Sequence, residues 1–468
     1  MSIKNHHLYY QQDLRVPLTS LSIVFRGAGE QQETESYAGL SRITAKMLLR
    51  GTTTMNRETI QQQFALLGAE INASVTETDF IITTSCFSKN SEEVLFFLWK
   101  IFDEINFPEN EIELVKKQEL NRLEATLQDA ENVLRYAKRY VLYEGSRFGK
   151  IGSRKSIQKI TREEIINYFQ KVLSANITYA TAISNLAQGE IAKLLQPFFA
   201  QRKTNGFVLQ PEIPFRKAKG VEAFIIHSPN ATNDRLLWSH KGITATDERR
   251  FALSLIIDAL GSFEGFLFDE LRNKNGWCYG VYAFTTPATT RPGNITYYAD
   301  PSDETSEHLI PALYHHLQTF SQEKSFIEKL QVRNSTFKNR YPYQLDLKYK
   351  LLSEINLDKY GIPIIDKKTY CEKIDNVRLE KANSIIQEIF DSNNITMVFY
   401  GDSERIQNIL KKINPELHPL AKKKKYLPAL VNFSGSSMAI SKIDVDECPK
   451  KVINETPALI LFLNASEV

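Results

Sequence analysis

The sequence predicts an α+β protein of two similar domains, each an antiparallel sheet covered by helices. Apolar residues at strand spacing and at helix spacing follow one another along the whole chain. Features of the first half also recur in the second at offsets of 210, 214 and 218 residues, which indicates a weak internal repeat. The recurring positions are Gly51 and Gly261, Lys159 and Lys373, and Asn176 and Asn394. Two copies of one layered fold explain both observations.

The first half alternates short strands with longer helices. Glycines that follow apolar periodic segments end two of the helices, at Gly51 and Gly68, and Thr161 is a good N-cap for a later one. We therefore expect strands at 20–25, 70–76, 79–87 and 177–183, and helices at 37–50, 57–67, 91–105, 109–128, 129–143, 162–173 and 188–199.

The second half contains the stretch on which a functional prediction depends. A helix over 246–261 precedes a second helix over 263–274, and Gly276 offers the left-handed residue that ends a helix. From Cys278 the period becomes two, which predicts a strand whose one face carries Tyr279, Val281, Ala283 and Thr285.

Four ranges describe the predicted domain organisation. Residues 1–205 form an N-terminal domain, the polar segment 206–222 is a linker, and residues 223–425 form a C-terminal domain. Residues 426–468 match neither copy and form a C-terminal extension. Its apolar run at 458–463 is expected to be either an added strand or a docking segment.

Composition excludes several classes of protein. The 468 residues carry a net charge of only +3, so no global field indicates nucleic acid. The basic run at 422–425 is expected to be a solvated linker or a surface turn. The cysteines form no CxxC pair and predict neither a zinc ribbon nor a disulfide framework. No signal peptide and no run of 18 apolar residues is evident, which predicts a soluble, cytoplasmic protein without a membrane partner. The cysteines are Cys86, Cys278, Cys371 and Cys448.

The turn between the helix over 263–274 and the next strand brings two hydrogen-bond donors together. Arg272 at the helix end and Tyr279 on the strand would suit a peptide carbonyl or a developing oxyanion. An arginine in an ion pair and a tyrosine packed on a sheet are the structural alternative.

Residues 39–52 resemble the zinc-binding helix of the M16 metallopeptidases, and the likeness extends over about residues 15–425. The family motif reads Gly-Leu-Ala-His-Phe-Leu-Glu-His-Met-Leu-Phe-x-Gly-Thr. This chain keeps its frame but replaces the His, Glu and His by Arg42, Ala45 and Lys46. The retained positions are Gly39, Leu40, Met47, Leu48, Gly51 and Thr52.

These replacements predict that the chain binds no metal of its own. Two cations cannot ligate zinc and would repel it, and Ala45 cannot act as a general base. The resemblance places the third ligand near Glu124 or Glu119, and either carboxylate is expected to be an orphan. The histidines elsewhere form no HxxH or HExxH pattern that could replace the site.

Residues 260–279 resemble a second family segment, Leu-Gly-Gly-x-x-x-Ser-Arg-Leu-Phe-x-x-Leu-Arg-x-x-x-Gly-Leu-x-Tyr. Arg272 and Tyr279 keep its seven-residue separation. In the family this pair reaches across a chamber to the substrate backbone beside the zinc of the other domain. The resemblance therefore implies catalytic contacts in trans for the pair, and substrate binding for Gly261, Ser262, Phe263 and Gly276.

One signature lost and one kept imply a non-catalytic subunit of a heterodimeric zinc peptidase. Each chain would supply half of a clam-like chamber, and the zinc would belong to an HxxEH-containing M16B partner. The substrate would be a peptide, with a leader peptide as one possibility. The alternative is a non-enzymatic peptide-binding or structural core subunit of a larger complex. The two readings differ in whether an HxxEH partner exists.

Overall fold

The computed structural model describes residues 7–143, 152–173, 177–200, 220–228, 233–286, 292–340, 347–413 and 459–463, together with isolated positions between them. The linker 206–222 and the extension 426–468 therefore lie mostly outside the described residues. The chain divides into two compact units. The first contains residues 1–125, 145–211 and 345–359, and the second contains 126–144, 212–344 and 360–468.

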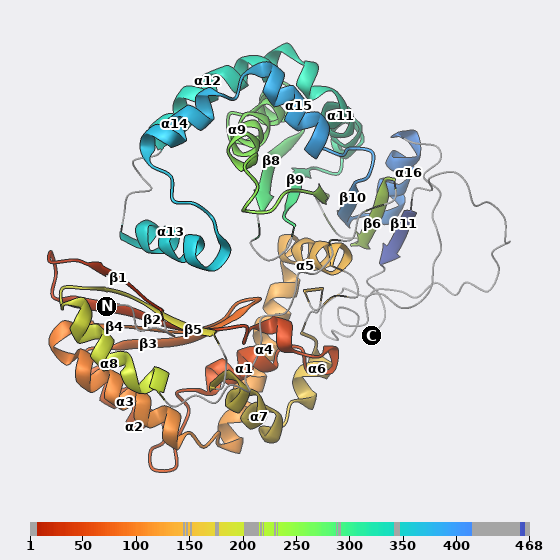
Figure 1. The fold of residues 1–468 in the computed structure, drawn as a ribbon. Helices are drawn as coiled ribbons and strands as arrows, with labels where there is room; N and C mark the ends of the chain where they lie inside the picture. Colours follow the sequence, from red (N-terminus) through yellow and green to blue (C-terminus); the bar gives the residue numbers. More distant parts are fainter. Residues whose placement is uncertain are drawn as a thin grey trace. The chain divides into compact units, whose positions relative to one another are not determined.

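The first unit is built on a five-stranded sheet with the order β1-β5-β2-β4-β3 (Figure 1). All neighbours are antiparallel except β1 and β5, which are parallel, so the sheet is mixed rather than wholly antiparallel. The predicted hairpin over 70–87 is confirmed as β3 and β4. The strands are β1 (His7–Gln12), β2 (Leu18–Arg26), β3 (Glu70–Val75), β4 (Asp79–Phe87) and β5 (Ile177–Ser184).

Helices cover one face of this sheet, where buried residues such as Ile60, Cys86 and Val94 form a core. The helices of the unit are α1 (Leu40–Met47), α2 (Arg57–Leu66), α3 (Ser91–Glu104), most of α4 (Glu109–Gln128), α6 (Arg154–Lys159), α7 (Arg162–Leu173), α8 (Gln188–Ala200) and α13 (Leu347–Tyr360). Short 3-10 turns occupy Glu30–Gln32, Glu35–Tyr37 and Ser88–Asn90. The opposite face carries side chains such as Ser20 and Ser85 and is covered only in part, by α13, because antiparallel strands can leave one face in solvent.

The second unit is built on a six-stranded sheet with the order β11-β6-β10-β7-β9-β8. Its outermost strand, β11, pairs in parallel with β6, so the final apolar run is an added strand, one of its two predicted forms. The strands are β6 (Glu222–His227), β7 (Arg235–Lys241), β8 (Cys278–Thr286), β9 (Asn294–Pro301), β10 (Thr396–Gly401) and β11 (Leu459–Leu463).

A large core lies between this sheet and α9, where Trp238, Leu255, Tyr297 and Phe326 are buried. Arg250–Asn273 is long and apolar enough to cross a membrane, but 67% of its apolar window is buried, so core packing accounts for its composition. The helices are α5 (Ala130–Leu142), α9 (Arg250–Gly261), α10 (Phe266–Phe268), the π-helix Asp269–Asn273, α11 (Ser306–Thr319), the 3-10 turn Phe320–Gln322, α12 (Lys324–Arg340), α14 (Lys367–Asp375), α15 (Leu379–Ile389) and α16 (Ser403–Ile413).

Two helices pack in the unit that is formed mainly by the other half of the sequence. Helix α5, from the N-terminal half, packs on β7 and β10, and its Lys138 donates a hydrogen bond to Thr296 Oγ1 of the neighbouring β9 at 3.2 Å. Helix α13, from the C-terminal half, packs through Leu351 and Ile355 on Tyr9 of β1. The compact units are therefore discontinuous in sequence, whereas the predicted ranges 1–205 and 223–425 are each continuous.

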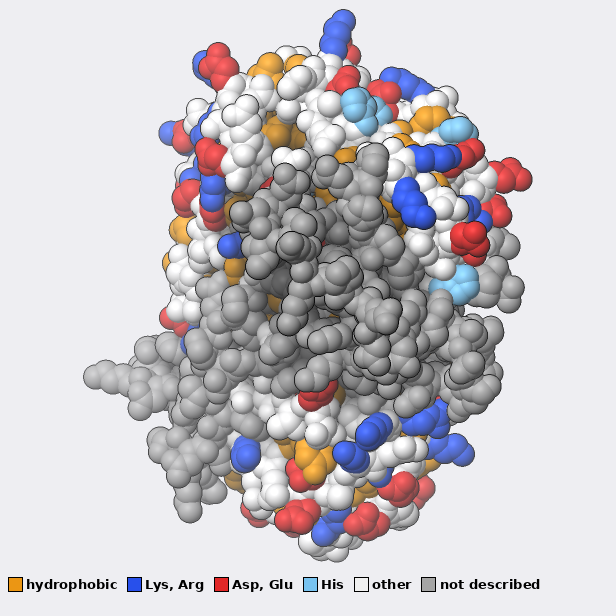
Figure 2. Space-filling model, turned by 90° about the vertical axis from the view of Figure 1, so that its right-hand side faces the viewer, with side chains coloured by type: hydrophobic (Ala, Val, Ile, Leu, Met, Phe, Trp, Pro, Cys, Tyr) orange, Lys and Arg blue, Asp and Glu red, His pale blue; other side chains and the backbone are white. Residues whose placement is uncertain are grey.

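Charged side chains are interspersed on the face drawn in Figure 2. Lysines and arginines alternate with aspartates and glutamates over the described parts of both units. On this face the described residues form no broad field of one sign, which agrees with the net charge of +3.

Candidate active site and its lost metal position

Helix α1 carries the three positions at which the sequence suggested a lost zinc motif. The helix begins after Gly39, whose φ of +105° is in the left-handed region. Buried Glu33 accepts hydrogen bonds from the backbone N–H groups of Gly39 (2.8 Å) and Ser41 (2.7 Å), so a remote carboxylate caps the helix. Burial raises the pKa of Glu33 to about 6, although these hydrogen bonds oppose the shift.

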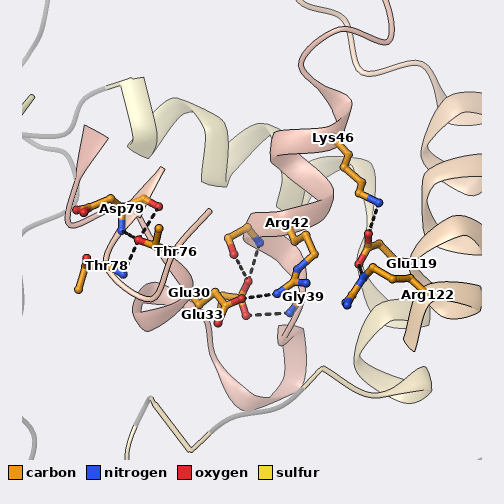
Figure 3. Close-up of polar contacts among 12 residues, drawn as sticks. Glu30, Glu33, Gly39, Arg42, Lys46, Thr76, Thr78, Asp79, Glu119 and Arg122 are labelled. Carbon is orange, nitrogen blue, oxygen red and sulfur yellow. Dashed lines mark hydrogen bonds and ion pairs between the residues drawn. The ribbon is translucent and has the colours of Figure 1, made fainter. Parts of the chain in front are cut away.

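Both cations of α1 form ion pairs with carboxylates (Figure 3). Arg42 Nη2 lies 2.6 Å from Glu30 Oε1, and Lys46 Nζ lies 2.5 Å from Glu119 Oε1. Ala45, between them in sequence, is buried. Each cation is therefore neutralised by an acid of the same unit, and the place of a metal is taken by two ion pairs.

Glu119, rather than Glu124, is the carboxylate of α4 that faces α1. Its side chain is almost fully buried and also pairs with Arg122 Nε at 3.0 Å. Burial favours the neutral acid, but Lys46 and Arg122 outweigh it and lower the pKa of Glu119. Glu124 instead pairs with Arg154. The expectation of an orphan carboxylate is therefore wrong, since both candidates have cationic partners.

This arrangement has no capacity to activate water through a metal. In the described part of the chain, no group of three or more His, Cys, Asp or Glu side chains is placed to hold a metal ion. At α1 the two side chains that would have to donate lone pairs are cations, which have none to offer. The zinc of a partner chain stays a prediction.

Arg272 and Tyr279, the second pair of predicted site residues, lie side by side in the second unit. The Arg272 guanidinium carbon is 4.9 Å from the centre of the Tyr279 ring and 4.8 Å from that of Phe268. The arginine thus contacts two aromatic rings, and it has no carboxylate partner among the described residues. Tyr279 is 75% exposed. Both donors are held in place and remain available to a ligand.

Two local irregularities of the backbone position Arg272 and Tyr279. Arg272 lies in the π-helix Asp269–Asn273, and π-turns often occur at functional sites. A β-bulge between Cys278 and Val281 then shifts the register of β8 against β9. Because a bulge re-aims side chains, Tyr279 is exposed while Val281 is buried, so the prediction that the two share one strand face is wrong.

The remaining predicted substrate-binding residues divide into packing and exposed positions. Gly261 is buried under β8, where a Cβ would lie 2.1 Å from the Ala283 backbone nitrogen, so close packing requires this glycine. Gly276 has φ +69° and open space around it, as expected of a helix stop. Phe263 is 65% exposed, and its ring centre lies 4.7 Å from that of Phe268, whereas Ser262 is half-buried.

Sequence reasoning missed the acids that complete the α1 region. Glu30 and Glu33 were not among the predicted site residues, yet Glu30 pairs with Arg42 and Glu33 caps α1. Arg122 was also missed. The available signal was the i, i+3 spacing of Glu119 and Arg122 on one helix, which favours an ion pair.

Taken together, the two units and α1 define a metallopeptidase-like fold in which the described residues form no cluster suited to a metal ion. Comparison with known families agrees. The model of the Insulinase family (Peptidase family M16) matches residues 16–145, and that of the Peptidase M16 inactive domain matches residues 159–329. The chain belongs to the M16 peptidase family, and the positions of the family's zinc motif on α1 are occupied by Arg42, Ala45 and Lys46.

Individual relatives are distant in sequence but similar over most of their length. An "Uncharacterized zinc protease" of Rickettsia felis is 22% identical over 78% of this chain and 88% of its own. A "Non-peptidase homolog YmxG" of Helicobacter pylori is 18% identical over 85% and 92%. The solved M16 inactive domain protein from Pseudomonas fluorescens has a TM-score of 0.72 at 17% identity, covering 86% of this chain and 97% of that one. This likeness supports the fold of two M16-type domains.

Proposed function

We propose that this chain is the non-catalytic subunit of a heterodimeric M16 zinc peptidase. In this role it supplies Arg272 and Tyr279 to a peptide bound at the zinc of an HxxEH-containing partner. The observation that carries the proposal is the Arg272–Tyr279 pair, in which the half-buried arginine contacts the exposed tyrosine ring. The cations of α1 in the same chain are instead paired with carboxylates.

The chemistry needs such donors. When a zinc-bound water attacks a peptide carbonyl, negative charge develops on the carbonyl oxygen. A guanidinium and a phenol in fixed positions stabilise that charge without reorganising during the reaction. Nothing in this chemistry requires the donors to belong to the chain that holds the metal.

Reconstitution tests the proposal. The full chain would be mixed with an HxxEH-containing M16B protein from the same genome, and cleavage of a peptide library would be followed by mass spectrometry. We expect a heterodimer in sedimentation velocity and chelator-sensitive cleavage by the mixture only. Stable assembly without cleavage would favour the alternative, a non-enzymatic peptide-binding or structural subunit. Cleavage by the lone chain would refute the proposal.

A further inference from the structure

The first unit contains a groove of about 600 Å³ between α13 and the open face of its sheet. Strand register places two rows of side chains on the groove floor. One row runs across the strands from Ile183 through Ser20 and Ser85 to Glu70. The next row runs from Thr181 through Ser22 and Thr83 to Asn72. The first row is thus apolar at one side, hydroxyl-bearing in the middle and acidic at the edge strand β3, whereas the second row is polar and uncharged.

Helix α13 forms a mostly apolar wall along this floor, which also includes Lys348. Leu351 and Ile355 pack against Tyr9, Tyr179 and Ile183, so hydrophobic contacts hold the helix on β1 and β5. Polar contacts from β1 add to this anchoring. They are the hydrogen bond from Tyr9 to Asp358 and the bond from Gln11 Nε2 to Glu354 Oε1 at 3.2 Å. Leu352 also lines the groove but is 54% exposed, so it has apolar surface left to cover.

The floor suits a polypeptide backbone. Serine and threonine hydroxyls each donate and accept, so a row of them can pair with both the N–H and C=O groups of a peptide. Their small side chains also leave room above the sheet. Glu70 forms no ion pair with any described residue and is exposed at the far end of the first row, so it offers an unused negative charge.

We propose that this groove binds an extended peptide segment with an apolar side chain on the α13 wall and a basic side chain at Glu70. The proposal rests on the proposed function, because it adds a substrate-binding subsite to a peptide-handling subunit. Three strand spacings of about 4.8 Å separate Ile183 from Glu70, or roughly 14 Å. An extended chain advances about 3.4 Å per residue, so the apolar and basic residues should be about four positions apart.

Fluorescence anisotropy of the full, partner-free chain tests this subsite. The probe is a fluorescein-labelled serine–glycine peptide with one leucine and, four positions later, one arginine. Leu352→Ser should weaken binding at least about fivefold, because an apolar contact is lost. The matched control is Leu357→Ser, since Leu357 is also exposed on α13 but does not line the groove. Equal losses in both variants, or no binding by the wild-type chain, would overturn the proposal.

Charge recognition is tested with a second peptide in which glutamine replaces the arginine. The wild-type chain should prefer the arginine peptide by about two- to fivefold, as expected for an exposed ion pair, and Glu70→Gln should remove the preference. Glu93→Gln is the control, because Glu93 lies on α3, which covers the opposite face of the sheet. A preference that survives Glu70→Gln contradicts the assignment. Failure here leaves cleavage by the reconstituted heterodimer unaffected, so it is distinguishable from failure of the proposed function.

Discussion

The ammonium of Lys46 lies 2.5 Å from the carboxylate of Glu119, and this contact joins α1 to α4 where the family's zinc site would be. A cation that is covalently part of the chain thus contacts a carboxylate that the family resemblance named as a candidate metal ligand. Glu119 is buried and has a second cationic partner in Arg122, so its charge is retained and paired. The ion pairs of Glu119 with Lys46 and Arg122 therefore supply a local electrostatic contact between α1 and α4.

Removing Lys46 should destabilise the first unit. Lys46→Met leaves the buried Glu119 with Arg122 as its remaining cation, at an expected cost of about 1–3 kcal/mol in the free energy of unfolding. Urea denaturation measures the loss, and adding Glu119→Gln should recover part of it. As a control, Lys100→Met removes a surface pair with Glu104 and should cost less than about 1 kcal/mol. Equal costs for the two methionine variants would show that the Lys46 pair is only a surface contact.

Restoring the motif should create a metal site. The wild-type chain is expected to hold no stoichiometric zinc, whereas the triple variant Arg42→His, Ala45→Glu and Lys46→His should bind about one zinc per chain, with Glu119 as the third protein ligand. Elemental analysis after gel filtration measures this. Adding Glu119→Gln should weaken binding, and Glu124→Gln should not, because Glu124 pairs with Arg154. Zinc in the wild-type chain, or equal effects of the two glutamine substitutions, would contradict this assignment.

The buried His240 predicts a pH dependence of stability. Burial lowers its pKa to about 4, and its Nε2 lies 3.0 Å from the Tyr297 hydroxyl. The unfolded imidazole, with a pKa near 6.5, binds a proton first as the pH falls. The stability contributed by neutral His240 is therefore complete above pH 6.5 and lost between pH 6.5 and 4, by about 3 kcal/mol in total.

The pH dependence can be isolated from other titrating groups by comparing variants. Glu33 has the opposite sign, since its raised pKa of about 6 adds stability at low pH that is lost as the pH rises from 4.5 through 6. Urea denaturation gives the free energy of unfolding of the wild type and of His240→Phe, and the contribution of Glu33 cancels in the difference between the two. That difference should shrink from pH 7 to pH 4. A difference that is constant over this range would mean that His240 does not titrate as described.

Local features of the site were predictable from sequence, and long-range pairing was not. The residue types at Arg42, Ala45 and Lys46 were enough to predict the loss of the zinc motif, because ligand chemistry depends on the side chain itself. The choice between Glu119 and Glu124 required the packing of α4 on α1. Strand periodicity likewise predicted β8 but not its bulge. The apolar residues still alternate along the sequence, and only the pairing of β8 with β9 shows the shift in register.

The exchange of α5 and α13 between the units has the same origin. The apolar residues of α5 predict a helix, but not which of two similar sheets it covers, and α13 was not among the predicted helices. Lys138 contacts Thr296, and Leu351 contacts Tyr9, across separations in sequence that no local pattern spans. The ranges proposed for the domains therefore followed the repeat, whereas the compact units follow side-chain packing.

The Arg272–Tyr279 pair carries the most direct prediction about catalysis. In the reconstituted complex, Tyr279→Phe should lower turnover by about 10²–10³-fold, which is typical for loss of one preorganised oxyanion donor. The substitution removes only a hydroxyl that has no hydrogen-bond partner among the described residues, and it keeps the ring next to Arg272. Assembly and the partner's zinc content should therefore stay unchanged.

Arg272→Ala should lower turnover by a similar factor, but it also removes contacts with the rings of Phe268 and Tyr279. Arg272→Lys separates these effects, because it keeps the charge and loses the planar guanidinium that lies over the rings. The matched control is Lys274→Ala, whose side chain lies just beyond the π-helix and pairs with Glu270 instead. Steady-state kinetics measures the turnover of each variant, and sedimentation velocity checks that each complex has assembled. If Tyr279→Phe and Arg272→Ala both assemble and cleave at the wild-type rate, the pair is structural, and the chain acts in the complex as a scaffold without a part in the chemistry.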